Sequence, residues 1–240
     1  MAQTIVVLGA RNLGGAIVDR FLELGWSAAA VARSEDTLAR VRERGALPIE
    51  ADASDPEALR EALESARQQL GSLDAVVNAV SASRPPAGGG PFGGGPFDQA
   101  DLDGFRGWTV AVAEQAFVFL STGIAALRQS GGGTLVQITG GSSRRAMPGR
   151  GLWAAGAFAT RALVQAAAQE QRDHGMHVAL LAVDATIESP KTAGYTRDTP
   201  REALADMPGV AKAVAFLVEQ GARTMTHELV VTPAGDRWVP

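Results

Sequence analysis

Short apolar runs that alternate with helical patterns most restrict how this chain can fold. Seven runs have the length and the apolar character of strands with both faces covered. They lie at residues 4–9, 27–32, 46–51, 73–80, 134–139, 177–183 and 228–232. Because helical patterns separate most of these runs, we expect a doubly wound, mostly parallel sheet with helices on both faces. The sequence therefore predicts an α/β fold, a single Rossmann-type domain over residues 1–240.

Helix signals occupy the intervals between these strands. Ser34 is the expected N-cap of one helix, because Glu35 and Asp36 follow it in the first turn. The segments SDPE (54–57) and TPRE (199–202) match the capping box that starts a helix. Further helices are expected at residues 13–24, 102–129, 152–171 and 210–220.

Charge and residue content exclude several classes of function. The net charge of −4 provides no basic field for nucleic acid or an anionic membrane. The chain has no cysteine, which excludes thiol catalysis and disulfides, and no acid–histidine spacing matches a metal site. The start MAQTIVVLGA lacks the parts of a signal peptide, and no uninterrupted apolar run has membrane-spanning length. We therefore expect a cytoplasmic protein without nucleic-acid, membrane or metal partners.

A glycine-rich loop joins the first strand to the helix after it. Its sequence is GARNLGG, at residues 9–15. Glycine permits a sharp turn and a close approach to a pyrophosphate, while the start of the helix supplies N–H donors and a positive dipole. The position between a strand and a helix favours a dinucleotide site over an ordinary tight turn.

Arginine follows the second strand, in the sequence Ala32-Arg33-Ser34. An NAD site would carry an acid near this point for the ribose 2′-hydroxyl, whereas arginine attracts a 2′-phosphate. Arg11, in the glycine-rich loop, is placed to form the other side of this clamp. The pattern favours NADP(H) as the cofactor; two solvated surface arginines are the alternative.

The motif GGGPF occurs twice in succession, at residues 88–92 and 93–97, within a Gly- and Pro-rich loop over residues 81–97. The loop follows the fourth strand, at the sheet edge where such folds bind ligands. In a mobile lid, Phe92 and Phe97 would touch substrate. A connector with incidental aromatic residues is the alternative.

In their order and spacing, these features resemble those of the short-chain dehydrogenase/reductase family over nearly the whole chain. Asp52 matches the aspartate that the family places against adenine, and Asn78 matches the first residue of the family's Asn-Asn-Ala-Gly motif. The segment VDATIES (183–189) stands where the family lays backbone along the nicotinamide, and THELVV resembles the last strand. The resemblance implies a substrate lid at residues 185–206.

The resemblance also implies, together with the arginines, a set of residues that bind NADP(H). They are Gly9, Arg11, Asn12, Leu13, Gly14, Arg33, Ser34, Asp52, Ala53, Asn78, Ala79, Val80, Ile138, Trp153, Asp184, Ala185 and Ile187.

A catalytic tetrad of Asn, Ser, Tyr and Lys is implied by the same resemblance, with the tyrosine protonating the carbonyl oxygen and the lysine lowering its pKa. Aligned on the fifth strand, Gly140 takes the serine position, Trp153 the tyrosine position and Ala157 the lysine position. The helix asparagine has no counterpart, because no asparagine follows Asn78. We therefore expect a divergent member that lacks the tetrad. Loss of general acid catalysis alone lowers a rate about 10²–10⁴-fold.

Few other side chains are placed to replace these groups. Tyr195 is the one tyrosine of the chain, and it follows Lys191 by four residues in the segment of the expected lid. Ser142, with Thr139 and Ser143, lies near the serine position, although hydroxyl groups there also cap turns.

Three functions are compatible with these residues. The first is an NADP(H)-dependent oxidoreductase that reduces a small apolar carbonyl by a non-standard route. The second is a redox-inactive NADP(H)-binding sensor or regulatory subunit, and the third is a non-redox enzyme on the same scaffold. Trp153 and Phe158 favour an apolar small-molecule ligand. Trp153 is expected either beside the nicotinamide or in the core or a subunit interface.

Two long helices, at residues 102–129 and 152–171, carry many alanines and few charges over parts of their length, and in the family the equivalent helices pair between subunits, which suggests self-association. We expect a homodimer or homotetramer. Burial of these helices under the chain's own sheet is the alternative.

Overall fold

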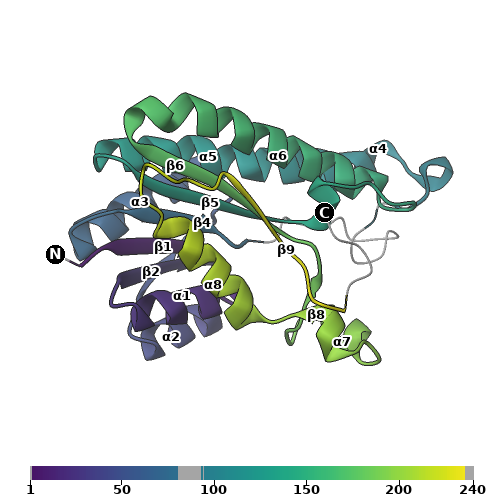
Figure 1. Ribbon diagram of the computed structural model, residues 1–240, viewed down its shortest axis with the longest axis horizontal. Coiled ribbons are helices and arrows are strands. Elements are labelled where there is room, and N and C mark those ends of the chain that lie inside the picture. Colours follow the sequence, from purple (N-terminus) through teal and green to yellow (C-terminus); the bar gives the residue numbers. More distant parts are fainter. Residues whose placement is uncertain (1, 81–92, 94, 236–240) are drawn as a thin grey trace.

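Seven parallel strands form the central sheet within the residues that the computed structural model describes, 2–80, 93 and 95–235 (Figure 1). The sheet order is β3-β2-β1-β4-β5-β6-β9. The strands are β1 (Thr4–Leu8), β2 (Ser27–Ala32), β3 (Leu47–Glu50), β4 (Ala75–Asn78), β5 (Gly133–Gly140), β6 (Met176–Val183) and β9 (Glu228–Val231). The predicted doubly wound α/β fold is confirmed.

Helices cover both faces of this sheet (Figure 1). One face carries α1 (Leu13–Glu23), α2 (Glu35–Glu43) and α8 (Met207–Val218), and the other carries α3 (Pro56–Leu70), α5 (Ala111–Gln129) and α6 (Gly151–Gln171). Each face encloses its own apolar core, with Phe21 fully buried in the first and Phe119 in the second. All eight residues of β6 are buried, as expected for a strand covered on both sides.

Two helix starts differ from the sequence expectation. Asp55, not Ser54, caps α3: its carboxylate accepts hydrogen bonds from the backbone N–H groups of Glu57 (2.9 Å) and Ala58 (2.8 Å). The Ser54 hydroxyl instead donates to Asp52 (2.6 Å). The expected start at residues 199–202 is wrong, because Arg201–Ala203 forms only a 3-10 turn. The last helix, α8, begins later, after its N-cap Asp206.

One continuous helical run connects α4 (Leu102–Phe105) to α5 through a π-helical turn at Arg106–Val110. The run packs against α3, α6 and β5. It is 28 residues long with a mean hydropathy of 1.7 in its most apolar window, of which 28% is buried. By length and composition alone this helix could cross a membrane. Charged residues interrupt it, among them Asp103, Arg106 and Glu114, so it is not the uninterrupted apolar run that the sequence analysis excluded.

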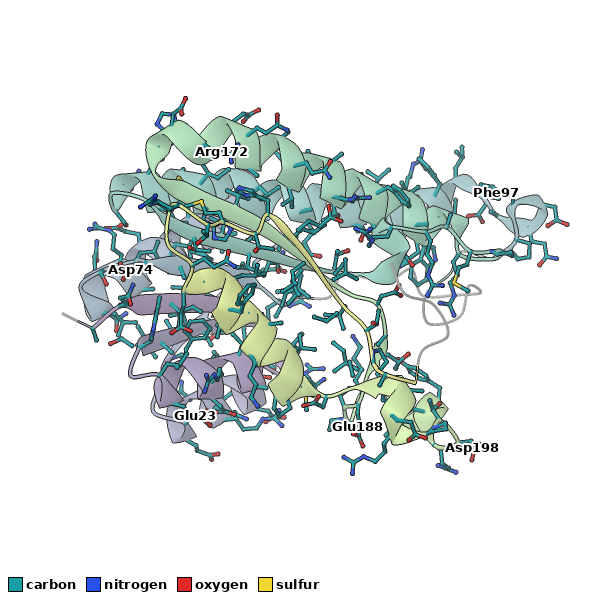
Figure 2. All side chains as sticks on the ribbon, in the orientation of Figure 1. Glu23, Asp74, Phe97, Arg172, Glu188 and Asp198 are labelled. Atoms are coloured by element: carbon teal, nitrogen blue, oxygen red, sulfur yellow. The ribbon has the colours of Figure 1, made fainter. Side chains whose placement is uncertain are left out.

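The expected lid segment at residues 185–206 forms a small unit of its own beside the ends of β6 and β9 (Figure 1). It contains β7 (Thr186–Ile187), α7 (Ala193–Thr196) and β8 (Leu204–Ala205). β7 and β8 pair in parallel, and the backbone N–H of Glu188 donates to the carbonyl of Ala205 (2.8 Å). Figure 2 shows Glu188 and Asp198 on this unit, with Phe97 on the opposite side of the same end of the molecule.

Candidate functional site

A cavity of about 870 Å³ lies at the carboxyl ends of the strands, where the order of the sheet changes direction between β1 and β4. Its lining comes from the loops after β1, β2, β3, β4 and β6, the end of β5, the helices α5 and α6, and the lid segment. Ligands of doubly wound folds bind at this kind of crevice, because the connections on either side of the switch point diverge.

The glycine-rich loop forms one wall of the cavity. Gly9 has φ +84°, and a Cβ atom there would lie 3.0 Å from Cγ2 of Val80. A Cβ atom at Gly14 would lie 2.0 Å from the carbonyl oxygen of Gly9, so the loop packs tightly against the first turn of α1. Residues 9–13 line the cavity and lead directly into α1. This geometry, with a helix N-terminus facing the cavity, fits a pyrophosphate.

Charged side chains gather where β2 and β3 end. Nη1 of Arg33 lies 3.1 Å from Oδ2 of Asp52, and both side chains are largely exposed, at 71% and 42%. The hydroxyl and the backbone N–H of Ser54 donate to Oδ1 of Asp52 (2.6 and 2.9 Å). These hydrogen bonds, together with the Arg33 charge, lower the pKa of Asp52. Arg11 and Ser34 line the same part of the cavity.

The buried side-chain amides of Asn78 and Gln137 form a hydrogen-bonded pair that lines the cavity. Nδ2 of Asn78 donates to Oε1 of Gln137 (3.0 Å), and Oδ1 of Asn78 accepts from the backbone N–H of Val80 (3.1 Å). Nε2 of Gln137 donates to the carbonyl of Ile138 (2.7 Å). The sequence reasoning missed Gln137, although a glutamine inside the apolar run TLVQIT was a signal that it needed a polar partner.

Apolar residues form the wall of the cavity where β5 ends and α6 begins. Gly140, Trp153 and Ala157 line it, so the structure brings together the three positions that the resemblance assigned to serine, tyrosine and lysine. The ring of Trp153 meets that of Trp108 edge to face, with centroids 5.7 Å apart and an interplanar angle of 78°. Trp108 is buried within the π-helical turn.

The packing of α6 on the π-helical turn is close. A Cβ atom at Gly156 would lie 2.9 Å from the carbonyl oxygens of Trp108 and Thr109. The Thr109 hydroxyl donates to the carbonyl of Leu152 (2.8 Å). These contacts fix the segment GLWAAGAFAT, residues 151–160, against α5 and hold one edge of Trp153 on the cavity.

Besides Phe97 of the GGGPF motif, five of the expected site residues that the structure describes do not line the cavity: Gly14, Ser142, Ser143, Phe158 and Asp184. Gly14 is used for packing inside the first turn of α1. The carboxylate of Asp184 turns toward the loop after β5, where Oδ1 pairs with Nη2 of Arg145 at 3.3 Å. The other cofactor-binding candidates line the cavity, as do Lys191 and Tyr195. The sequence reasoning missed further polar lining residues: Thr37, Ser54, Glu114, Gln115, Thr160, Thr186, Ser189 and Thr192.

Two phenylalanines of the repeated GGGPF motif were expected to touch substrate if the loop is a lid. Phe92 lies outside the described residues. Phe97 does not line the cavity and is 77% exposed. Its ring lies against the start of α6, where a Cβ atom at Gly151 would be 2.6 Å from Cε2 of Phe97. Contact of Phe97 with substrate is therefore not supported by its position.

The family model for short chain dehydrogenases matches residues 3–198 of the chain. This protein belongs to the short-chain dehydrogenase family. The family's enzymes are oxidoreductases that use nicotinamide cofactors, which agrees with the glycine-rich loop and with the position of the cavity. The family resemblance expected from the order of the motifs is confirmed.

Solved structures with the same fold include other short-chain dehydrogenases. A short-chain type dehydrogenase/reductase from Mycobacterium ulcerans is 21% identical with a TM-score of 0.81, and the match covers 95% of this chain and 87% of that one. An alcohol dehydrogenase from the archaeon Thermococcus sibiricus, complexed with 5-hydroxy-NADP, is 22% identical with a TM-score of 0.80 over 100% of both chains. A metagenomic short-chain oxidoreductase in complex with NADP is 21% identical with a TM-score of 0.75 over 98% of both chains. At these identities the similarity shows the fold alone.

Proposed function

We propose that this short-chain dehydrogenase binds NADP(H) and reduces a small apolar carbonyl compound by a route that does not use a tyrosine on α6. The observation that carries the proposal is the single cavity, which is lined by Arg33 after β2, by the glycine-rich loop after β1 and by Trp153 on α6, in the order in which the sheet places these elements. Its residues fit a dinucleotide: the loop and the start of α1 would hold the pyrophosphate, and Asp52 and Ala53 would lie beside the adenine.

Arg33 and Arg11 support the preference for the phosphorylated cofactor. Both line the end of the cavity where β2 stops, the position at which such folds read the ribose 2′ group. The Arg33–Asp52 ion pair is exposed, and exposed pairs contribute only about 0–1 kcal/mol. A 2′-phosphate therefore competes well for the guanidinium, because it carries more charge than a carboxylate and presents more acceptor oxygens.

Bound NADP(H) would supply hydride beside the apolar wall of the cavity. Trp153 and Ala157 would exclude water there and hold the ring plane, whereas neither side chain carries a proton suited to an alkoxide. This is why we place the proton source elsewhere than on α6. Positioning of the two reactants contributes much of a reaction rate even without the usual acid.

The same apolar wall favours a second function, a redox-inactive NADP(H)-binding sensor or regulatory subunit. A protein that only senses the cofactor needs the Arg33 end of the cavity and a closed nicotinamide end, but no transferable proton. Turnover of a carbonyl compound distinguishes the two functions. A non-redox enzyme on this scaffold would show product formation that does not consume NADPH.

Calorimetry with NADPH and NADH tests the proposal. We expect NADPH to bind more tightly, and the Arg33→Ala variant to lose about ten- to a hundred-fold of NADPH affinity, since hydrogen bonds to charged groups contribute about 1.5–3 kcal/mol. The matched control is Arg42→Ala: Arg42 is an exposed arginine of α2 that pairs with Glu35 and does not line the cavity. Equal affinity of the unaltered protein for NADPH and NADH contradicts the proposal.

A further inference from the structure

The cavity contains few groups that can deliver a proton to a reduced carbonyl oxygen. Its titratable lining residues, among those that the structure describes, are Arg11, Arg33, Asp52, Glu114, Lys191 and Tyr195. Arginine does not lose its proton in proteins. Asp52 is ionised at neutral pH, because Ser54 and Arg33 lower its pKa. Glu114 lies on α5, away from the lid, and is exposed, as are Lys191 and Tyr195, of which Tyr195 is 45% exposed. Only Lys191 and Tyr195 combine a transferable proton with a place in the lid.

The lid holds these two side chains on the cavity through the residue next to Lys191. Thr192 is buried, and its hydroxyl donates to the carbonyl of Ile187 (2.7 Å) and accepts from the backbone N–H of Ser189 (3.0 Å). Its carbonyl accepts from the backbone N–H of Tyr195 (3.0 Å). Thr192 therefore anchors the turn to β7, and both Lys191 and Tyr195 line the cavity from that turn.

We propose that Tyr195 is the proton donor of this protein, and that the Lys191 ammonium group, four residues earlier in the chain, is its positioning charge. This inference rests on the proposed function. In the reduction, hydride with its electron pair passes from the reduced nicotinamide to the carbonyl carbon, and the electrons of the C=O π bond move to the oxygen. That oxygen takes the proton of the Tyr195 hydroxyl. The tyrosinate is reprotonated from solvent, and the positive charge of Lys191 stabilises it in the meantime.

The lid position has a direct chemical consequence. A proton donor on α7 approaches the substrate from the side opposite the Trp153 wall of α6, so the carbonyl oxygen must point toward the lid. The apolar wall of the cavity, which includes Trp153 and Ala157, then faces the carbon substituents. A substrate with an apolar body and a single carbonyl group fits this division.

Chemical modification provides a test that does not depend on turnover. Tyr195 is the sole tyrosine of the chain, so nitration by tetranitromethane, followed by nitrotyrosine absorbance, reports on this residue alone. We expect NADP⁺ to slow the nitration at least several-fold, because the dinucleotide would lie between the glycine-rich loop and the lid. An unchanged nitration rate at a saturating NADP⁺ concentration, verified by calorimetry, overturns the inference.

Single-turnover kinetics test the chemistry. The NADPH-loaded protein is mixed with a panel of small apolar ketones, aldehydes and diketones, and the loss of NADPH absorbance is followed. We expect Tyr195→Phe to lower the hydride-transfer rate about 10²–10⁴-fold without changing NADPH affinity. Lys191→Met should lower the hydride-transfer rate and shift the pH profile of that rate. Lys191→Arg should restore part of the rate and part of the original pH profile. Arg197→Gln, which removes a charge from the lid at a residue outside the cavity, is the matched control.

The outcomes separate this inference from the proposed function. Failure of the protein to bind NADPH contradicts the proposed function, and the inference fails with it. Carbonyl reduction that is unaffected in Tyr195→Phe overturns the inference alone. NADPH binding without reduction of any carbonyl in the panel also overturns the inference and favours the sensor.

Discussion

The contact between Gly141 and Asp184 leads to a sharp prediction about stability. Gly141 follows β5, and a Cβ atom there would lie 1.8 Å from Oδ1 and 2.1 Å from Cγ of Asp184. The carboxylate has little freedom to withdraw, because Asp184 is only 8% exposed and is paired with Arg145. Gly141→Ala must therefore displace either the ion pair or the backbone of the loop. Its neighbour Gly140 is the matched control, since a Cβ atom there meets nothing closer than the carbonyl oxygen of Val183 at 3.9 Å.

The size of the stability loss in Gly141→Ala follows from the overlap between the added methyl group and the Asp184 carboxylate. Inserting a methyl group into a filled space destabilises by about 1–3 kcal/mol, and the entropy that alanine removes from the unfolded chain offsets about 0.4–1 kcal/mol of this. The protein has 240 residues, so a net loss of about 1–2 kcal/mol lowers Tm by about 2–8 °C. Gly140→Ala should change Tm by much less.

Thermal unfolding followed by circular dichroism measures both variants, and a double-mutant cycle identifies the cause. Asp184→Ala removes the carboxylate and leaves Arg145 without this partner, which we expect to destabilise by about 1–3 kcal/mol. In that background Gly141→Ala should be nearly neutral, giving a coupling energy of about 1–2 kcal/mol. An equal loss of Tm for Gly141→Ala with and without Asp184 refutes the reasoning, as does an equal loss for Gly140→Ala.

Three further predictions concern other parts of the molecule. Burial lowers the pKa of His177, so the unfolded chain takes up a proton near pH 6.5 that the folded protein resists. The free energy of unfolding, measured by urea titration, should therefore fall from pH 7 to pH 5. The His177→Gln variant should show a weaker dependence on pH. Trp153 lines the cavity, so NADPH should quench tryptophan fluorescence less in Trp153→Phe than in the unaltered protein at equal saturation; an identical quench would place Trp153 away from the nicotinamide. Phe117 on α5 and Phe158 on α6 are 59% and 41% exposed, so we expect a homodimer or homotetramer that Phe158→Glu weakens; a monomer mass by light scattering at micromolar concentration contradicts this.

The regular part of the fold was predictable because helices and strands follow from local patterns of apolar and polar residues. All seven strands were expected within a few residues of their places, since strands of a sheet that is covered on both faces are largely apolar. The largest error at an end concerns β4, expected at residues 73–80 and found at Ala75–Asn78, because apolar residues continue past the last ladder hydrogen bonds. The two-residue strands β7 and β8 were missed because a pair that short leaves no period to detect.

The site was predictable where it depends on chain order and not where it depends on distant partners. The glycine-rich loop, Arg33 and Asp52 were expected at the site, but the ion pair between Arg33 and Asp52 was not. The pairing of Arg145 with Asp184 spans 39 residues and that of Arg144 with Glu228 spans 84. Such pairs leave no local signal, because each residue taken alone looks like an ordinary surface charge. The same limit explains why the pairing of the Asp184 carboxylate with Arg145 was not expected.

The π-helical turn at Arg106–Val110 makes the shape of the cavity depend on chain length as well as on residue type. Residues in an α-helix are spaced by about 100° around the axis, and a π turn holds one residue more than an α turn would. Deleting one residue inside this turn would restore a regular helix and move Trp108 around the helix axis relative to α5. Trp108 would then leave the edge of Trp153, and the cavity would widen at its apolar wall with every lining residue unchanged. In a lineage of such proteins, a single-residue insertion or deletion in this turn would change the size of ligand that the cavity accepts. Substitution of the lining residues would not be needed for that change.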